Sequence, residues 1–102
     1  MSATAIITGA SSGIGKSIAL TLAKEYDRIA ITSYHHPDDL LNTKELLTKL
    51  GVDCIAECGD CGNYAFVQGF VAKILQQWGQ IDVLINNAGI SHVGLLTDLS
   101  VP

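Results

Sequence analysis

Residues 8–15, TGASSGIG, most constrain what this chain can fold into. They follow an apolar run at 5–7 and precede a helical pattern formed by Ile14, Ile18, Leu22 and Tyr26. A glycine-rich turn between a strand and a helix leaves free N–H groups at the positive helix end, where a pyrophosphate can bind. Gly9 permits the tight turn, Gly13 a close backbone approach, and Gly15 close helix packing. The spacing G-x-x-x-G-x-G differs from the common G-x-G-x-x-G fingerprint, so a glycine turn without a ligand is the alternative interpretation.

The rest of the chain alternates strand and helix patterns. Apolar runs flanked by turn residues predict strands over 3–8, 28–32, 53–57 and 83–85, of the kind buried in a parallel sheet. Helices are predicted over 13–26, from Pro37 to the stop at Gly51, and from an N-cap at Asn63 to the stop at Gly79. The inward faces of the last two are predicted to comprise Leu40, Leu47 and Leu50, and Phe66, Val67, Phe70, Val71, Ile74 and Trp78. Right-handed crossovers then give an α/β fold, a Rossmann-type doubly wound parallel sheet of strand order 3-2-1-4.

A second motif, NNAG, occupies Asn86 to Gly89 and directly follows the fourth predicted strand. Together with the glycine turn and Asp60 after the third strand, it resembles the short-chain dehydrogenase/reductase family over the whole chain. The resemblance implies an NAD(P)-dependent oxidoreductase that reduces a carbonyl to an alcohol, most similar to 3-oxoacyl-acyl-carrier-protein reductases. Residues 90–96 also look like reductases acting on modified elongation factor P. The ligand is expected over the carboxyl ends of strands one and four, where the strand order reverses.

The resemblance also assigns the cofactor contacts residue by residue. The adenosine phosphates would be lined by Gly9, Ser11, Ser12, Gly13, Ile14 and Gly15. Asp60 would accept a hydrogen bond from the adenine amino group, and Cys61 would contact adenine through its backbone. The stretch beneath the adenine-side ribose would comprise Asn86, Asn87, Ala88 and Gly89, with Ile90 approaching the nicotinamide. A solvated loop acid is the alternative for Asp60, because Asp favours turns.

The residue at the end of the second strand indicates which dinucleotide is preferred. An acid there binds the ribose 2′-hydroxyl and repels a 2′-phosphate. In family register this position is Ser33, followed by Tyr34, His35 and His36, so no carboxylate meets the ribose. NADP(H) is therefore favoured over NAD(H), although the basic residue found before the second motif glycine in NADP-using relatives is here Ser12. Lys16 or His35 could compensate, and an exposed histidine pair without a phosphate role is the alternative.

The catalytic residues that the resemblance implies do not occur in this sequence. The family uses a Tyr as general acid, a Lys four residues later, a Ser that holds the carbonyl and a later Asn. The three tyrosines, Tyr26, Tyr34 and Tyr64, are followed four residues on by Ala30, Asp38 and Gln68. Residues 1–102 are therefore expected to be the cofactor-binding portion of a reductase that lacks the catalytic carboxyl-terminal half and is inactive alone. A non-catalytic nucleotide-binding module is the alternative.

The charge and the apolar content of the chain restrict the classes of partner that it can bind. A net charge of −4 without a Lys/Arg cluster argues against nucleic acid and anionic membranes. No apolar run approaches the roughly 20 residues of a membrane span, and the cytoplasm is the expected location. A chain of 102 residues is long enough for one domain. Apolar residues make up 48% of it and charged residues only 16%, which indicates that part of its surface is buried against another chain or segment. The expected partners are a small carbonyl substrate, free or on acyl carrier protein, and further copies of this chain. We expect a homo-oligomer that forms through the edge of the fourth strand or through the exposed sheet face.

Three cysteines offer a different class of function. Their spacing C-x-x-x-C-x-x-C, at Cys54, Cys58 and Cys61, resembles the cluster signature of radical S-adenosylmethionine enzymes. An iron–sulfur cluster, or a zinc site with His35 or His92, is therefore a second alternative. Free thiols are favoured, because Cys54 falls on a predicted strand and Asp60 already has a place in the dehydrogenase register. The odd count also disfavours structural disulfides.

Overall fold

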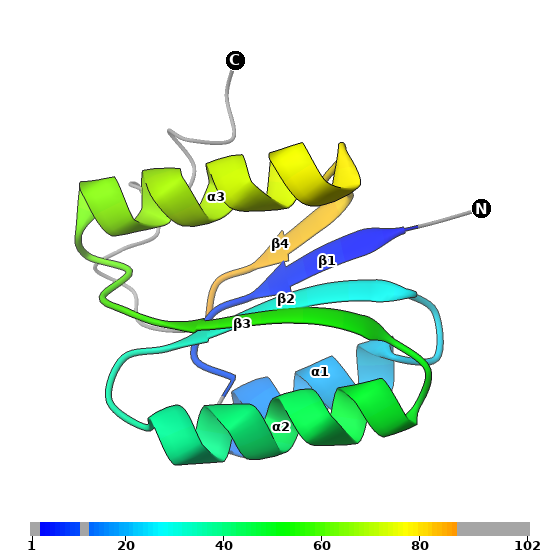
Figure 1. The fold of residues 1–102 in the computed structure, drawn as a ribbon. Helices are drawn as coiled ribbons and strands as arrows, with labels where there is room; N and C mark the ends of the chain where they lie inside the picture. The colour runs from blue at the N-terminus through cyan, green and yellow to red at the C-terminus, as the bar shows by residue number, and fades with distance from the viewer. Residues whose placement is uncertain (1–2, 11–12, 88–102) are drawn as a thin grey trace.

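In the computed structural model, which describes residues 3–10 and 13–87, strands and helices alternate along the chain (Figure 1). The elements, in order, are β1 (Thr4–Ile7), α1 (Gly13–Leu22), β2 (Arg28–Ser33), α2 (Pro37–Lys49), β3 (Asp53–Cys58), α3 (Tyr64–Trp78) and β4 (Val83–Ile85). None of the helices in these ranges is long and apolar enough to cross a membrane.

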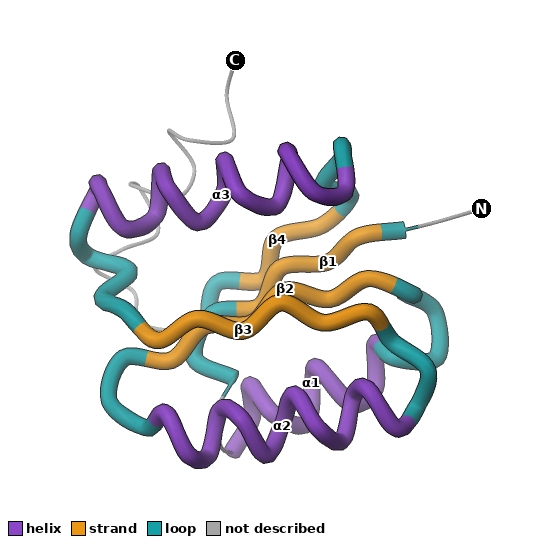
Figure 2. The backbone as a smooth tube through the Cα atoms, in the orientation of Figure 1, coloured by secondary structure: helices purple, strands orange, loops and turns teal. Residues whose placement is uncertain are grey.

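The strands form one parallel sheet of order β3-β2-β1-β4, which confirms the predicted topology. β1 lies inside the sheet, where Ile6 is in register with Ala30 of β2 and Leu84 of β4. Helices α1 and α2 cover one face and α3 covers the other (Figure 2). Each crossover helix thus packs onto the sheet between parallel strands, as a doubly wound fold requires.

Two apolar layers hold the helices to the sheet. Alternate strand residues face opposite sides, so Ile7 belongs to one layer and Ile6 to the other. The layer under α1 and α2 includes Ala5, Ile7, Ala19, Ile29, Ile31, Leu40 and Leu47. The layer under α3 comprises Ile6, Ala30, Ile55, Phe70, Ile74 and Trp78. Full burial of each large apolar side chain stabilises the fold by about 1.5–3 kcal/mol.

The ends of α1 and α2 differ from the predicted ones. The sequence pattern extends the first helix to Tyr26, but α1 ends at Leu22, because the amides of Lys24 and Glu25 bond to carbonyls three residues back instead of four. Leu50, predicted to face inward, is 59% exposed. It is the C-cap residue of α2 and lies beyond the last turn that covers the sheet. The buried stripe of α2 is instead Leu40, Thr43 and Leu47.

Helix α3 begins and ends as its sequence predicts. The Asn63 side chain accepts a hydrogen bond from the Phe66 N–H at 3.1 Å, which satisfies one of the free amides at the helix start. Gly79 has φ 81°, in the left-handed region, and its N–H donates to Leu75 O at 2.9 Å. The predicted inward residues of α3 are buried or half-buried. The caps at the two ends of α3 therefore fix where the helix begins and where the chain turns toward β4.

Candidate functional site: a nucleotide-binding edge of the sheet

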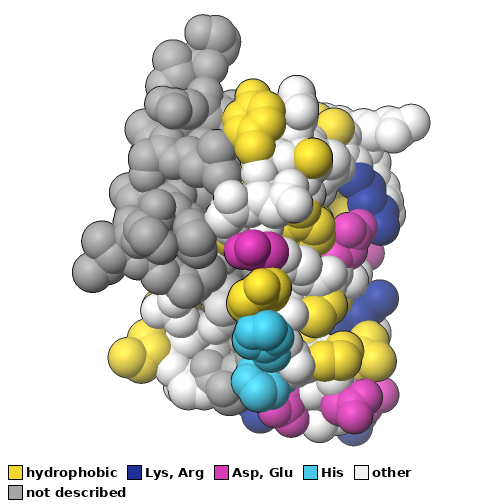
Figure 3. All heavy atoms as spheres, turned by 90° about the vertical axis from the view of Figure 1, so that its left-hand side faces the viewer, with side chains coloured by type: hydrophobic (Ala, Val, Ile, Leu, Met, Phe, Trp, Pro, Cys, Tyr) yellow, Lys and Arg dark blue, Asp and Glu magenta, His cyan; other side chains and the backbone are white. Residues whose placement is uncertain are grey.

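The candidate site lies at the carboxyl ends of the strands, which is the side that Figure 3 turns toward the viewer. β1 pairs with β2 on one side and with β4 on the other, so the strand order reverses at β1. Loops that leave neighbouring strands in opposite directions create a crevice at such a point, and ligands of doubly wound folds bind there. The glycine turn follows β1, and the NNAG motif begins directly after β4.

Thr8 joins these two motifs. Its N–H donates to Ile85 O at 3.0 Å and so continues the β1–β4 ladder by one residue. Its hydroxyl donates to Asn86 Oδ1 at 2.9 Å and accepts from the Asn87 N–H at 2.8 Å. The Thr8 side chain is buried, and both of its side-chain bonds are at least partly shielded from water. Two segments 78 residues apart in sequence are therefore joined at one corner, which we call the Thr8 corner.

Gly15 makes the closest approach in this corner. A Cβ atom at this position would lie 2.0 Å from Gly9 O and 2.7 Å from Asn87 Nδ2. That amide nitrogen itself donates to Gly9 O at 3.3 Å. Gly9 and Gly13 have φ of 67° and 62°, a backbone region that side chains rarely adopt. The predicted close packing at Gly15 is confirmed, whereas cofactor contacts by these glycines remain predictions.

The chain after β2 presents an aromatic pair. Ser33 is only 3% exposed, and its carbonyl accepts from the Gly59 N–H at 2.8 Å. Tyr34 is 57% exposed, and its ring lies 3.8 Å from the ring of His35, centroid to centroid, at 37°. The Tyr34 carbonyl accepts a hydrogen bond from Cys58 Sγ at 3.3 Å. The first side chains to reach solvent at this strand end are therefore Tyr34 and His35.

Asp60 and Cys61 form the loop after β3. Asp60 Oδ1 accepts from the Gly62 N–H at 2.7 Å, and the Asp60 carbonyl accepts from the Asn63 N–H at 2.9 Å. These bonds fix a tight turn that places Asp60 at the carboxyl edge of the sheet. Cys61 is buried with its Sγ 3.4 Å from Thr32 Oγ1, and this burial raises the pKa of the Cys61 thiol.

The cysteines do not converge on one point. Cys54 and Cys58 both belong to β3, four residues apart, and a strand rises about 3.3 Å per residue, so roughly 13 Å separates them. Burial raises the pKa of Cys54 to about 12, which disfavours the thiolate a metal needs. Within residues 3–10 and 13–87, no three His, Cys, Asp or Glu side chains are arranged to hold a metal ion. His92, the alternative zinc ligand, lies outside the described residues.

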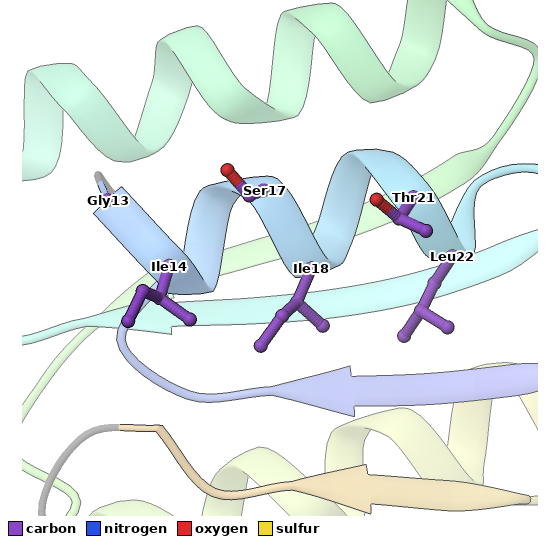
Figure 4. A pocket seen from close by; sticks show the side chains of 6 residues that line it. All are labelled: Gly13, Ile14, Ser17, Ile18, Thr21 and Leu22. Carbon is purple, nitrogen blue, oxygen red and sulfur yellow. The ribbon is translucent and has the colours of Figure 1, made fainter.

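An apolar groove follows the exposed side of α1. Figure 4 shows that Ile14, Ile18 and Leu22 point from the helix in the same direction. Together with Gly13, Ser17 and Thr21 they line a hollow of about 480 Å³, in which Ile14 is 72% exposed. The Ile14 side chain thus belongs to this groove, and a phosphate contact at Ile14 would have to come from its backbone.

Several predicted contacts lie outside the described residues, namely Ser11, Ser12, Ala88, Gly89 and Ile90. Among the described ones, the structure brings together Gly9, Gly15, Asn86 and Asn87, and separately places Asp60 with Cys61 beside the end of β2. Thr8 and Thr32, which make these connections, were not predicted as site residues. Position alone could have indicated Thr8, since it is the last residue before the turn.

The corner fits a dinucleotide. Buried Asn86 Nδ2 has no hydrogen-bond partner among the described residues, so a donor is available at the switch point. The Gly9 to Gly15 turn leads into the positive end of α1. The strand order and the corner at the switch point place the chain in the class of doubly wound α/β proteins, whose ligands bind at this position.

Comparison with known proteins makes this specific: residues 3–101 match the family model "short chain dehydrogenase", and the chain belongs to that family. Among curated relatives, the uncharacterized oxidoreductase YhxC of Bacillus subtilis is 40% identical over 90 residues, covering 88% of this chain and 32% of its own. The 3-oxoacyl-[acyl-carrier-protein] reductase FabG of Staphylococcus aureus is 36% identical over 96 residues, covering 94% of this chain and 39% of its own.

Solved structures of reductases superpose on this chain. The crystal structure of a variant actinorhodin polyketide ketoreductase with NADPH superposes with a TM-score of 0.87 at 28% identity, covering 96% of this chain and 46% of that one. YwfH, described as an NADPH-dependent reductase involved in bacilysin biosynthesis, gives 0.78 at 36% identity, covering 87% and 38%. The chain thus spans less than half the length of each of these relatives.

Proposed function

We propose that this chain forms the NAD(P)-binding part of an oxidoreductase that reduces a carbonyl to an alcohol. The observation that carries the proposal is the Thr8 corner, in which one hydroxyl bonds both asparagines of the NNAG motif at the switch point. A glycine turn that binds no ligand would not require hydrogen bonds to a second motif.

Different groups of residues would bind different parts of the dinucleotide. The turn from Gly9 to Gly15, with Ser11, Ser12 and Ile14, would hold the phosphates through backbone N–H groups. Asp60 would accept from the adenine amino group, next to the Cys61 backbone. Asn86, Asn87, Ala88 and Gly89 would support the ribose, and Ile90 would face the nicotinamide. When bound, the nicotinamide supplies the hydride for carbonyl reduction.

The finer assignments rest on relatives. The family binds nicotinamide cofactors, and two similar solved structures are those of a ketoreductase with NADPH and of an NADPH-dependent reductase. Together with Ser33 in place of an acid, this supports NADP(H) as the preferred cofactor. The FabG relatives support a 3-oxoacyl thioester on acyl carrier protein as the substrate class. A cytoplasmic location stays a prediction.

Nucleotide titration tests the binding role. Purified chain should enhance and blue-shift NADPH fluorescence in a saturable manner. Asp60→Asn, which weakens the acceptor for the adenine amino group, should reduce affinity for NADPH, NADH and 5′-AMP alike. Glu45→Gln on the exposed side of α2 is the matched control and should bind as wild type. Failure of every nucleotide to bind would overturn the proposed function.

Activity of the chain alone is tested with acetoacetyl thioesters and NADPH. We expect no turnover above background, because a positioned proton donor typically supplies about 10²- to 10⁴-fold and no Y-x-x-x-K occurs in the sequence. Turnover by pure chain would contradict this expectation. Binding without turnover when the full-length gene product is assayed would instead favour the non-catalytic module.

We also propose self-association. In the described residues β4 lies at the edge of the sheet, and its three residues are half-buried while those of β1 are fully buried. An edge with unpaired backbone groups favours pairing with another chain. Light scattering at micromolar concentration should report more than one copy. A stable monomer would count against this assembly.

A further inference from the structure

Thr32 of β2 contacts two segments of the candidate site from inside the protein. It is 1% exposed, and its carbonyl accepts a hydrogen bond from the N–H of Ala10, in the glycine turn, at 2.9 Å. Its hydroxyl lies 3.4 Å from the Sγ atom of Cys61. Cys61 belongs to residues 59–63, which lead from β3 to α3 (Figure 1) and which we call the adenine loop. One buried residue therefore joins the turn that would hold the phosphates to the loop that would hold adenine.

The Cys61 side chain anchors the adenine loop beneath α3. It is 5% exposed and forms a small buried cluster with Val67, against which apolar side chains of α3 and β4 pack. In these apolar surroundings, the bond between Cys61 and the Thr32 hydroxyl satisfies both polar groups. Either group would be left buried without a partner if the loop moved away, which costs free energy. The pair therefore favours one position of the loop.

Packing at Gly59 restricts the other side of the adenine loop. A Cβ atom at this position would overlap the ring of Phe66, so the ring lies directly on the Gly59 backbone. Asp60 lies between Gly59 and Cys61. Its carboxylate accepts from the Gly62 N–H at 2.7 Å. The position of the Asp60 carboxylate is therefore set by the contact of Gly59 with α3 and by the bond of Cys61 to β2.

The Cys61 thiol is not placed to form a disulfide with Cys58. Side chains alternate along a strand, and Cys54 and Ala56 of β3 pack with the layer under α1 and α2. Cys58 continues this alternation and faces the same side. Cys61 packs on the opposite side, under α3. The two thiols therefore lie toward opposite faces of the sheet, and the polar contact of Cys61 is the one with Thr32.

We infer that Thr32 is a positioning residue for the nucleotide, because its bond to Cys61 sets the adenine loop relative to the glycine turn. The inference rests on the proposed function, in which Asp60 and the Cys61 backbone contact adenine. Thr32 is enclosed by protein, so its hydroxyl acts on the ligand only through Cys61. Loss of this hydroxyl should weaken the binding of adenine and leave the phosphate contacts intact.

The experiment measures dissociation constants of 5′-AMP and 5′-IMP for the full chain and its variants. IMP carries the same ribose and phosphate but lacks the adenine amino group, so wild type should prefer AMP. Thr32→Val keeps the shape of the side chain and should weaken AMP about two- to tenfold, the range for one hydrogen bond, with IMP unchanged. Thr32→Ser should recover most of this loss. Cys61→Ala should resemble Thr32→Val, and the double variant should lose less than the sum, since no buried polar group is left unpaired.

Thr43→Val is the matched control, because Thr43 is also buried and its hydroxyl donates to Asp39 O at 3.2 Å within α2. It should leave both constants unchanged. An unchanged AMP-to-IMP ratio in Thr32→Val, or additive losses in the double variant, overturns the inference; if Thr32→Val does not fold, the ratio in Cys61→Ala decides in the same way. If wild type binds both nucleotides equally, nucleotide binding stands and this inference fails. If wild type binds neither of them nor NADPH, the proposed function fails as well.

Discussion

Replacing Gly15 with alanine probes the corner on which the site depends. In an exposed helix, alanine is favoured over glycine by about 1 kcal/mol. Here the new Cβ would lie 2.0 Å from Gly9 O and 2.8 Å from Gly9 C, although carbon contacts are optimal only near ~3.5 Å. The backbone of the glycine turn must therefore move by more than an ångström.

The loss of stability in Gly15→Ala can be worked out from these contacts. Overpacking of this kind costs about 1–3 kcal/mol. The shift also breaks the Asn87 Nδ2 bond to Gly9 O, which contributes about 1 kcal/mol and offsets the gain in helix propensity. The net expectation is a loss of about 1–3 kcal/mol in the free energy of unfolding, with about 4–8 °C in Tm for each kcal/mol in a domain of this size. Affinity for NADPH should fall with it, because the turn that would hold the phosphates is displaced.

Urea unfolding followed by far-UV circular dichroism measures this loss, and an unchanged m value shows that the unfolded state is unaffected. Gly69→Ala is the matched control, since Gly69 is also helical and a Cβ there would meet no atom within 4 Å. It should stabilise the protein by about 0.5–1 kcal/mol. If Gly15→Ala is as stable as Gly69→Ala and still binds nucleotide, the close approach does not exist as described.

Three further predictions concern single contacts. Thr8→Val leaves the Asn87 N–H without its acceptor and should cost about 1–3 kcal/mol in urea unfolding, while Thr8→Ser should recover most of it; equal stability of the two would refute the role of the hydroxyl. Asn63→Ala should cost about 1 kcal/mol and Asn63→Asp much less, so an equal loss in both would exclude side-chain capping of α3. Iodoacetamide at pH 8 should label the exposed Cys58 first by mass spectrometry, because burial raises the pKa of both other thiols; prior labelling of Cys54 would contradict that protection.

The topology followed from the sequence because each strand pattern was unambiguous. Continuous apolar runs such as Ala5 to Ile7 can be buried on both faces only in a covered parallel sheet, and the glycine turn fixed where the first crossover begins. Helix ends were less predictable. Leu50 continues the apolar spacing of α2 by sequence, but the turn at Gly51 directs the chain away before that residue reaches the sheet.

The candidate site could be predicted at the level of motifs but not of contacts. Sequence separates Thr8 from Asn87 by 79 positions, and only the β1–β4 register brings the hydroxyl within 2.8 Å of that amide. In the same way, Ser33 reads as a surface position at a strand end. In the structure Ser33 is still paired with Cys58 of β3, and the Gly59 N–H bond to its carbonyl continues the ladder beyond it, so this position is buried.

The Thr8 corner also links ligand binding to the order in which the chain assembles. Because its partners lie 78 and 79 residues away, the corner forms only after β4 has docked on β1, and closing so long a loop costs a large amount of chain entropy. β4 has three half-buried residues, so it is expected to open locally at a lower free energy than β2. A nucleotide that binds only the closed corner stabilises that closure by RT ln(1 + [L]/Kd). Amide exchange of Leu84 and Ile85 should therefore slow as NADPH is added, while exchange in the middle of β2 stays the same.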